Sequence, residues 1–71
     1  MRYVAIIEKG PTSFGAYVPD LPGCVAAAKT ARQVRRLIRE AIRLHLEDLR
    51  DRGIPVPKPT TASEVIDLKV A

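Results

Sequence analysis

The sequence has few of the features that stabilise small proteins. Among its 71 residues it has one cysteine, Cys24, which excludes a disulfide bond within the chain, and it has no tryptophan. A chain of this length folds as one small domain that buries only about 60% of the surface exposed by its unfolded form. Such domains often gain stability by association, and we therefore expect a homodimer or a higher homo-oligomer.

Sequence features of membrane-spanning and exported proteins are also missing. No apolar run approaches the roughly 18 residues that a membrane span requires. Residues 1–8 show no signal-peptide pattern, and a lone cysteine fits a reducing compartment. We therefore expect a cytoplasmic protein without a membrane partner. The net charge of +4 permits an anionic partner, but a solvated surface explains it equally well.

The first half of the chain predicts a three-stranded antiparallel meander. Residues 2–8 are rich in Val, Ile and Tyr, and both alternating sets of side chains are largely apolar. This pattern favours a strand that is covered on both faces. Residues 14–18 and 24–29 predict the second and third strands.

The stretch Gly15–Cys24 ends one strand and starts the next. Pro19 lacks an N–H group and is expected to end the second strand. Pro22 sets the φ angle of position i+1 in a type II turn, and Gly23 supplies the positive φ of position i+2. Leu21–Cys24 is therefore predicted to be a tight turn.

A long helix is predicted over residues 31–52. Thr30 and Gln33 fit a capping box at its start. Gly53 suits the first position beyond the helix, and Pro55 prevents its continuation.

This helix has two contrasting faces. The apolar face, expected to cover the sheet, comprises Val34, Leu37, Ile38, Ala41, Ile42, His45 and Leu49. The opposite face carries Arg32, Arg36, Arg39, Arg43 and Arg50. Arg36 with Glu40, and Arg43 with Glu47, have the i,i+4 spacing of ion pairs. The arginine face is either a solvated surface or a site for an acidic protein or a phosphate backbone.

The last part of the chain divides into a linker and a terminal strand, after a sheet-and-helix core over residues 1–53. Residues 54–63 are rich in proline and are expected to be extended. In the segment 64–71, Ile66, Leu68 and Val70 alternate with polar side chains, which predicts a half-buried strand. Two outcomes stay open: this strand returns to its own sheet, or it pairs with a neighbouring chain.

Four stretches of the chain resemble the HicB-like antitoxin family, and together they span nearly the whole sequence. They are the first strand ending in Ile7-Glu8-Lys9, the stretch Gly15–Cys24, the helix core Ile38–Leu46 and the tail Gly53–Pro59. The order Asp-Leu-Pro-Gly-Cys, at residues 20–24, is the most specific of these matches.

The resemblance implies an α+β fold, a partial RNase H-like sheet with one covering helix, in the order strand-strand-strand-helix-strand. It also implies a non-enzymatic protein that binds and masks HicA, a small and usually basic RNA-cleaving toxin. Many members carry a further C-terminal DNA-binding domain. Because this chain ends at Ala71, we expect a short form without that domain.

Two other functions stay open. The arginine face is compatible with a free-standing oligomeric scaffold or an RNA-associated protein. Nucleic acid is not favoured, because this helix has no aromatic side chain on which bases could stack. An RNase H-like enzyme is least favoured, since Glu8, Asp20 and Glu40 lie at a strand end, a turn and a helix flank. Nothing in the sequence gathers these acids around Mg²⁺, and Asp20 is expected to cap the turn that follows it.

No catalytic residue, metal site or cofactor is predicted. Cys24 and His45 are too few ligands for a metal ion, and both are expected in the packed interior. We expect a partner to contact the turn and the charged helix face. The candidate contacts are Tyr17, Asp20, Leu21, Pro22, Gly23, Arg32, Arg36, Arg39 and Arg43.

Overall fold

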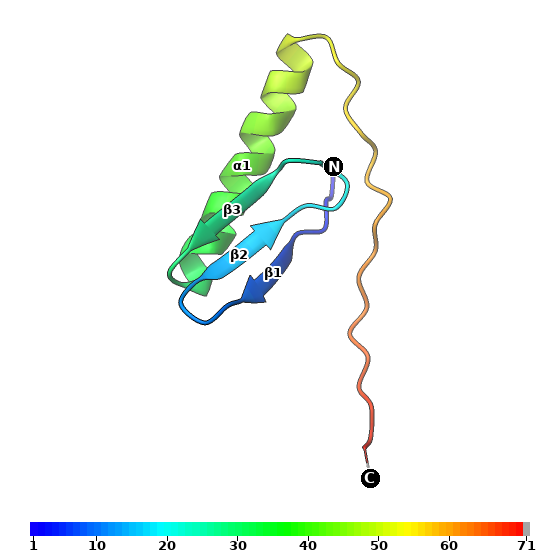
Figure 1. Ribbon diagram of the computed structural model, residues 1–71. Coiled ribbons are helices and arrows are strands. Elements are labelled where there is room, and N and C mark those ends of the chain that lie inside the picture. The colour runs from blue at the N-terminus through cyan, green and yellow to red at the C-terminus, as the bar shows by residue number, and fades with distance from the viewer. Residues whose placement is uncertain (71) are drawn as a thin grey trace.

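The computed structural model describes residues 1–70 and has two layers, a small sheet and one helix (Figure 1). The three strands form an antiparallel meander in the order β1-β2-β3. The elements are β1 (Ile6–Lys9), β2 (Phe14–Tyr17), β3 (Val25–Ala28) and α1 (Ala31–Asp51). The predicted α+β fold with a three-stranded meander and one long helix is thus confirmed.

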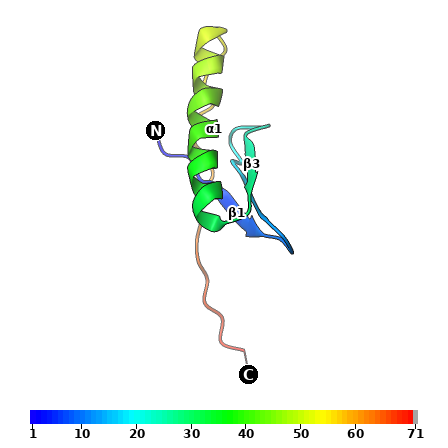
Figure 2. The same ribbon diagram turned by 90° about the vertical axis from the view of Figure 1, so that its left-hand side faces the viewer.

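The strand register divides the sheet into two unlike faces. Ile7 pairs with Ala16, and Ala16 pairs with Ala26, so these small and branched side chains share the face that α1 covers. Successive side chains of a strand point to opposite faces. The neighbouring row, Ile6 with Tyr17 and Val25, therefore lies on the other face, which α1 leaves open (Figure 2).

The predicted type II turn is confirmed by its geometry. Gly23 has a φ of 85°, and the Cys24 N–H donates to the Leu21 carbonyl at 3.0 Å. A second turn precedes it, because the Leu21 N–H donates to the Val18 carbonyl at 3.1 Å. The Val18 N–H donates to the Cys24 carbonyl at 3.2 Å and closes the connection. The chain from Val18 to Cys24 is therefore a compact double turn.

Both ends of α1 follow the local sequence signals. The Thr30 side chain accepts a hydrogen bond from the Gln33 N–H at 3.1 Å, as an N-cap residue does. At the other end, Gly53 has a φ of 68° and donates to the Arg50 carbonyl, while the Ile54 N–H donates to the Leu49 carbonyl. This is a Schellman motif, which leaves α1 one residue shorter than predicted, with Arg52 as its C-cap.

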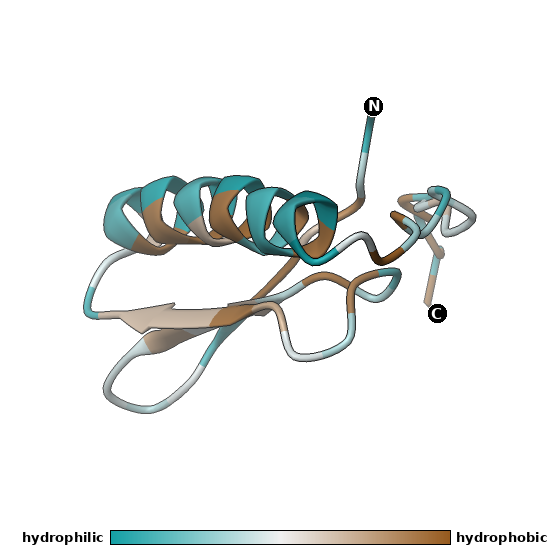
Figure 3. Ribbon diagram, turned by 90° about the horizontal axis from the view of Figure 1, so that it is seen from above, coloured by the Kyte–Doolittle hydropathy of each residue, from teal (hydrophilic) through white to brown (hydrophobic). Residues whose placement is uncertain are grey.

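The core lies between the helix-facing side of the sheet and the apolar face of α1 (Figure 3). Leu21 and Val34 are completely buried, and Cys24 and Ile38 are nearly so. The predicted apolar face is largely correct, but Leu37 is exposed and Leu46 packs against the core beside the predicted residues. The core is small, as expected for this chain length.

Strand β1 is shorter and less covered than the sequence indicates. It begins at Ile6 rather than near residue 2, because β2 ends at Tyr17, the residue that pairs with Ile6. It is an edge strand, and α1 is the only layer against the sheet within residues 1–70. The expectation that β1 is covered on both faces is therefore wrong for this single chain.

The predicted C-terminal strand is not present in the described part of the chain. Residues 54–70 form an extended arm without strand pairing, and Ala71 lies outside the described residues. Pro55, Pro57 and Pro59 lack the N–H groups that ladder pairing needs. Beyond them the arm runs away from the sheet, so the alternating segment has no strand beside it (Figure 1).

Burial predicts which leucine the fold depends on. We expect Leu21→Ala to lower the free energy of unfolding by about 2–5 kcal/mol, because it leaves a cavity in the core. Leu44 is 55% exposed, so Leu44→Ala is the matched control and should cost about 0.5 kcal/mol or less. Urea unfolding followed by circular dichroism measures both values, and equal losses would contradict this description of the core.

Candidate partner-binding surfaces

The open sheet face presents a row of apolar side chains across all three strands. Ile6, Tyr17 and Val25 are neighbours in the strand register. Tyr17 is 42% exposed and Val25 is 65% exposed, whereas Ile6 is half-buried. Exposed apolar side chains that form a continuous patch are typical of protein contact sites. Tyr17, one of the predicted contact residues, is thus placed at the centre of this row.

The next row of the same face has one charged residue and two small ones. Glu8 pairs with Gly15, and Gly15 pairs with Ala27. A side chain on Gly15 would meet nothing within 4 Å, so the face is flat and open at this point. The sequence reasoning missed Val25 and Ile6 as surface residues. The sequence did contain a signal for them. Both alternating sets of side chains in residues 2–8 are apolar, which indicates that the second sheet face is apolar as well.

The double turn lies at one end of this face. Its predicted contact residues are of two kinds, exposed and buried. Pro22 and Gly23 are exposed, and they can touch a partner. Leu21, between Asp20 and Pro22, is 0% exposed and lies in the core. Its side chain anchors the turn, which leaves Pro22 and Gly23 as the available surface.

Asp20 fastens the C-terminal arm to the double turn. Its carboxylate accepts the backbone N–H groups of Thr60 and Thr61 at 3.0 and 2.9 Å. It also accepts their two hydroxyl groups at 2.9 and 2.8 Å. We call this set the Asp20 clamp. The expectation that Asp20 caps its own turn is replaced by this long-range role, which joins residues 40 positions apart in sequence.

The clamp favours the ionised form of Asp20. Its pKa falls from the ordinary value of 3.8 to about 2, chiefly because the Thr61 N–H donates to the carboxylate. Partial desolvation raises the pKa, while the other hydrogen bonds from Thr60 and Thr61 lower it further. A second attachment holds the arm nearby, since the Tyr3 hydroxyl donates to the Pro57 carbonyl at 2.5 Å.

The arginine face lies on the far side of the domain from the open sheet face. Arg32, Arg36, Arg39 and Arg43 are all exposed on α1, whose outer side is hydrophilic (Figure 3). Because the apolar side of α1 faces the sheet, these arginines lie on the opposite side of the domain from the open sheet face that carries Tyr17. The structure therefore does not bring all predicted contact residues together on one surface.

Few acids offset these arginines. The Arg43 guanidinium lies 3.9 Å from the Glu40 carboxylate, which is the i,i+3 pair rather than the predicted pair with Glu47. At the end of the face, Arg50 lies 3.5 Å from the Asp51 carboxylate. Within the described residues, Arg32, Arg36 and Arg39 form no ion pair, and the expected Arg36–Glu40 pair is absent. The first half of the face, from Arg32 to Arg39, is consequently a strip of positive charge without ion pairs.

The described residues show no arrangement suited to metal or thiol chemistry. Among residues 1–70, no group of three or more His, Cys, Asp or Glu side chains is placed to hold a metal ion. Cys24 is buried, and its burial raises the pKa of the thiol. The protonated form is the unreactive one, so Cys24 is a core residue. The one helix within residues 1–70 is not both long enough and apolar enough to cross a membrane.

Comparison with protein families gives a match along almost the whole chain. Residues 3–69 match the family described as the HicB-like antitoxin of bacterial toxin–antitoxin systems. This range includes all three strands, the helix and most of the arm.

Curated relatives come from distant organisms. A UPF0150 protein of Helicobacter pylori is 47% identical over 45 residues, which cover 63% of this chain and 62% of that protein. A UPF0150 protein of Thermoplasma acidophilum is 36% identical over 82% of this chain and 86% of its own length. An uncharacterised 14.9 kDa protein of Haemophilus phage HP1 is 31% identical over 94% of this chain. The match covers only 50% of the phage protein.

A solved structure shares the fold and part of the sequence. A chain of the HicA3 and HicB3 toxin–antitoxin complex superposes with a TM-score of 0.71 and is 33% identical. The superposition covers 84% of this chain and 70% of that chain. The similar chain is HicB3, which in that structure is assembled with HicA3.

The Asp20 clamp predicts a titration with an unusual midpoint. Because the pKa of Asp20 is lowered, the clamp is complete above pH 3.8 and is lost as the pH falls through about 2. We expect the amide shifts of Thr60 and Thr61 to follow this transition in an NMR titration. Asp20→Asn, which removes the charge, should shift both amides and speed their hydrogen exchange at neutral pH.

Asp67→Asn is the matched control, because Asp67 is an exposed acid of the same arm. It should leave both threonine amides unchanged. A midpoint near 3.8, or Thr61 amide shifts that Asp20→Asn does not alter, would contradict the clamp.

Proposed function

This chain belongs to the HicB-like antitoxins of bacterial toxin–antitoxin systems, and from that premise we propose that it binds and masks a small HicA-like toxin. The observation that carries the proposal is its similarity to HicB3, a chain found in complex with HicA3. At 33% identity and a TM-score of 0.71, the likeness extends to sequence as well as to fold.

The open sheet face, with Pro22 and Gly23 at its edge, is the surface we assign to the toxin. Its apolar row of Ile6, Tyr17 and Val25 provides the contact area. Flat apolar patches with an aromatic centre are typical of the fully buried part of protein interfaces. A toxin covered by this surface loses access to its RNA.

The distribution of charge also favours the open sheet face as the toxin-binding side. The resemblance implies a basic toxin, and like charges placed together weaken association. The open sheet face carries Glu8 and no arginine or lysine in its two central rows. The arginine face carries unneutralised positive charge and would repel such a partner. The sheet side is therefore the more favourable docking side.

Masking of this kind needs no chemistry from the antitoxin. Glu8 lies on β1, Asp20 is occupied by the two threonines and Glu40 lies on α1 beside Arg43. Steric and electrostatic masking needs no proton or phosphoryl transfer to these side chains. As the partner of an RNA-cleaving toxin, the chain would act in the cytoplasm.

The arginine face supports a second candidate function, contact with the phosphate backbone of a nucleic acid. The favouring observation is that Arg32, Arg36 and Arg39 form no ion pair within residues 1–70. Together with Arg43 they occupy four successive positions along one helix face, over about three turns. Contacts of this type fix position on the backbone without reading sequence.

Val25→Asp tests the toxin-binding face. We expect it to raise the dissociation constant for a HicA-like toxin at least 10-fold, about 1.4 kcal/mol, because a charge then faces an apolar contact. Isothermal titration calorimetry measures the constant, and rescue of growth in cells that express the toxin gives an independent readout.

Leu44→Asp is the matched control, since Leu44 is an exposed apolar residue of α1 outside the open sheet face. It should bind the toxin like the wild type. Loss of binding in an Arg36→Glu, Arg39→Glu variant but not in Val25→Asp would move the site to the arginine face. No binding by the wild-type chain would reject the toxin proposal.

Phosphate contact by the arginine face predicts a strong salt dependence. Four phosphate contacts on duplex DNA give a slope of about −3.6 for log K against log salt concentration. Mobility shifts measured at increasing salt determine this slope. Arg36→Glu with Arg39→Glu should abolish the shift, while Arg52→Glu at the far helix end should not. Absence of a shift at low salt would remove this candidate.

A further inference from the structure

Four arginines in the first half of α1 lie closer together than the arginine face as a whole. They follow one another at i, i+3, i+4 and i+7 and therefore adjoin on about two turns of the helix. All four side chains are exposed. We call them the arginine quartet, which comprises Arg32, Arg35, Arg36 and Arg39. Arg35 is not among the contact residues predicted from the sequence.

The quartet borders a hollow of its own. This hollow has a volume of about 250 Å³, and its lining consists of these four arginines. A second hollow of about 270 Å³ is lined by Arg36, Arg39, Glu40 and Arg43. The Glu40 carboxylate, 3.9 Å from the Arg43 guanidinium, makes the second hollow less favourable for an anion. The first hollow is therefore the better anion site of the two.

The quartet has an electrostatic cost in the free protein. Arg32 with Arg36, and Arg35 with Arg39, are like charges at i,i+4, an arrangement that destabilises a helix. The first turn of α1 contains no acid, and within residues 1–70 no member of the quartet forms an ion pair. A bound anion with several charges offsets this repulsion, so its binding stabilises the folded chain.

The chemistry of these side chains favours phosphate groups that lie close together. Each guanidinium donates in a planar fork that fits two oxygens of a phosphate or a carboxylate. The carboxylates of an acidic protein stand on separate side chains, whereas a short phosphate chain gathers several charges in one small volume. Four guanidinium groups around one hollow match the second distribution. Since α1 has no Phe, Tyr or Trp, a nucleotide base finds no stacking surface there.

We propose that the arginine quartet binds a short phosphate chain, such as inorganic tripolyphosphate or the triphosphate group of a nucleotide. The site differs from the nucleic-acid candidate in one residue, because it uses Arg35 where a phosphate backbone would use Arg43. It includes no residue of the open sheet face, so it stays accessible when a toxin is bound there. The site is therefore independent of the proposed toxin binding.

Isothermal titration calorimetry at low ionic strength and without magnesium tests the ligand class. Tripolyphosphate should bind at least about 10-fold more tightly than orthophosphate, because only the chain reaches several guanidinium groups at once. ATP and GTP should bind within about threefold of tripolyphosphate, since the base makes no stacking contact. AMP should bind like orthophosphate.

Three results of this titration would overturn the proposal. The first is no binding of tripolyphosphate, and the second is equal binding of tripolyphosphate and orthophosphate. The third is a nucleotide that binds at least about 10-fold more tightly than tripolyphosphate, which would show recognition of its base.

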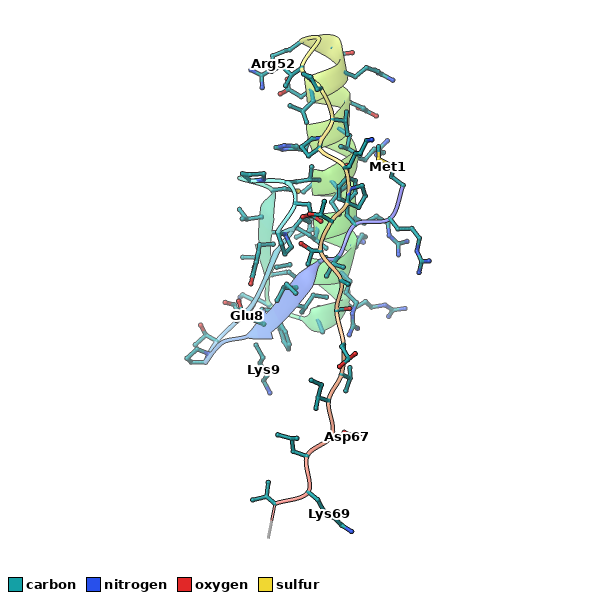
Figure 4. The ribbon with its side chains drawn as sticks, turned by 90° about the vertical axis from the view of Figure 1, so that its right-hand side faces the viewer. Met1, Glu8, Lys9, Arg52, Asp67 and Lys69 are labelled. Atoms are coloured by element: carbon teal, nitrogen blue, oxygen red, sulfur yellow. The ribbon has the colours of Figure 1, made fainter. Side chains whose placement is uncertain are left out.

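Two variants that each remove one positive charge locate the site. Arg35→Gln should raise the dissociation constant for tripolyphosphate at least about 10-fold, while Arg43→Gln should change it less than about twofold. Arg52→Gln is a further control and should leave binding unchanged. Arg52 lies at the end of α1 remote from the quartet and pairs with Asp48 at 2.9 Å (Figure 4). Equal effects of Arg35→Gln and Arg43→Gln would indicate general attraction to the arginine face and would reject the quartet.

A nucleic-acid backbone gives the opposite pattern. Binding of duplex DNA that Arg43→Gln weakens and Arg35→Gln does not, without binding of tripolyphosphate, would assign the face to nucleic acid instead of the proposed ligand.

A second measurement uses the wild-type chain. The side-chain Nε–H signals of the quartet should shift in NMR spectra when tripolyphosphate is added, and those of Arg50 and Arg52 should not. Equal shifts at all these arginines would contradict a localised site.

Discussion

The buried turn residue Leu21 is the constraint on which the rest of the structure depends. The double turn from Val18 to Cys24 places this side chain beneath α1, where it packs in one cluster with Val34. The same backbone hydrogen bonds bring the ends of β2 and β3 together, so the turn also determines how the two strands pair. Only Leu21 and Val34 are completely buried large side chains within residues 1–70, so this part of the chain has no second core to replace this one.

The position of Asp20 follows from the burial of Leu21. Since Leu21 points inward, the preceding carboxylate remains at the surface of the turn and can accept hydrogen bonds from Thr60 and Thr61. One connection thereby orders three things: the sheet, the core and the start of the arm. Carboxylates that accept several N–H and O–H donors hold extended backbone well, because each hydrogen bond is assisted by the charge.

Features with a local chemical cause could be predicted from the sequence. Features that depend on which sheet face is covered could not. Pro22 and Gly23 specify a type II turn, and Thr30 and Gly53 specify the helix ends, because φ preference and capping act within a few residues. The alternation of residues 2–8 correctly showed two apolar faces, but it could not show that only one of them is covered in a single chain. Val25 was missed as a surface residue because it lies on the sheet face that α1 does not cover. The Asp20 clamp joins segments 40 residues apart, and no periodicity reports such a contact.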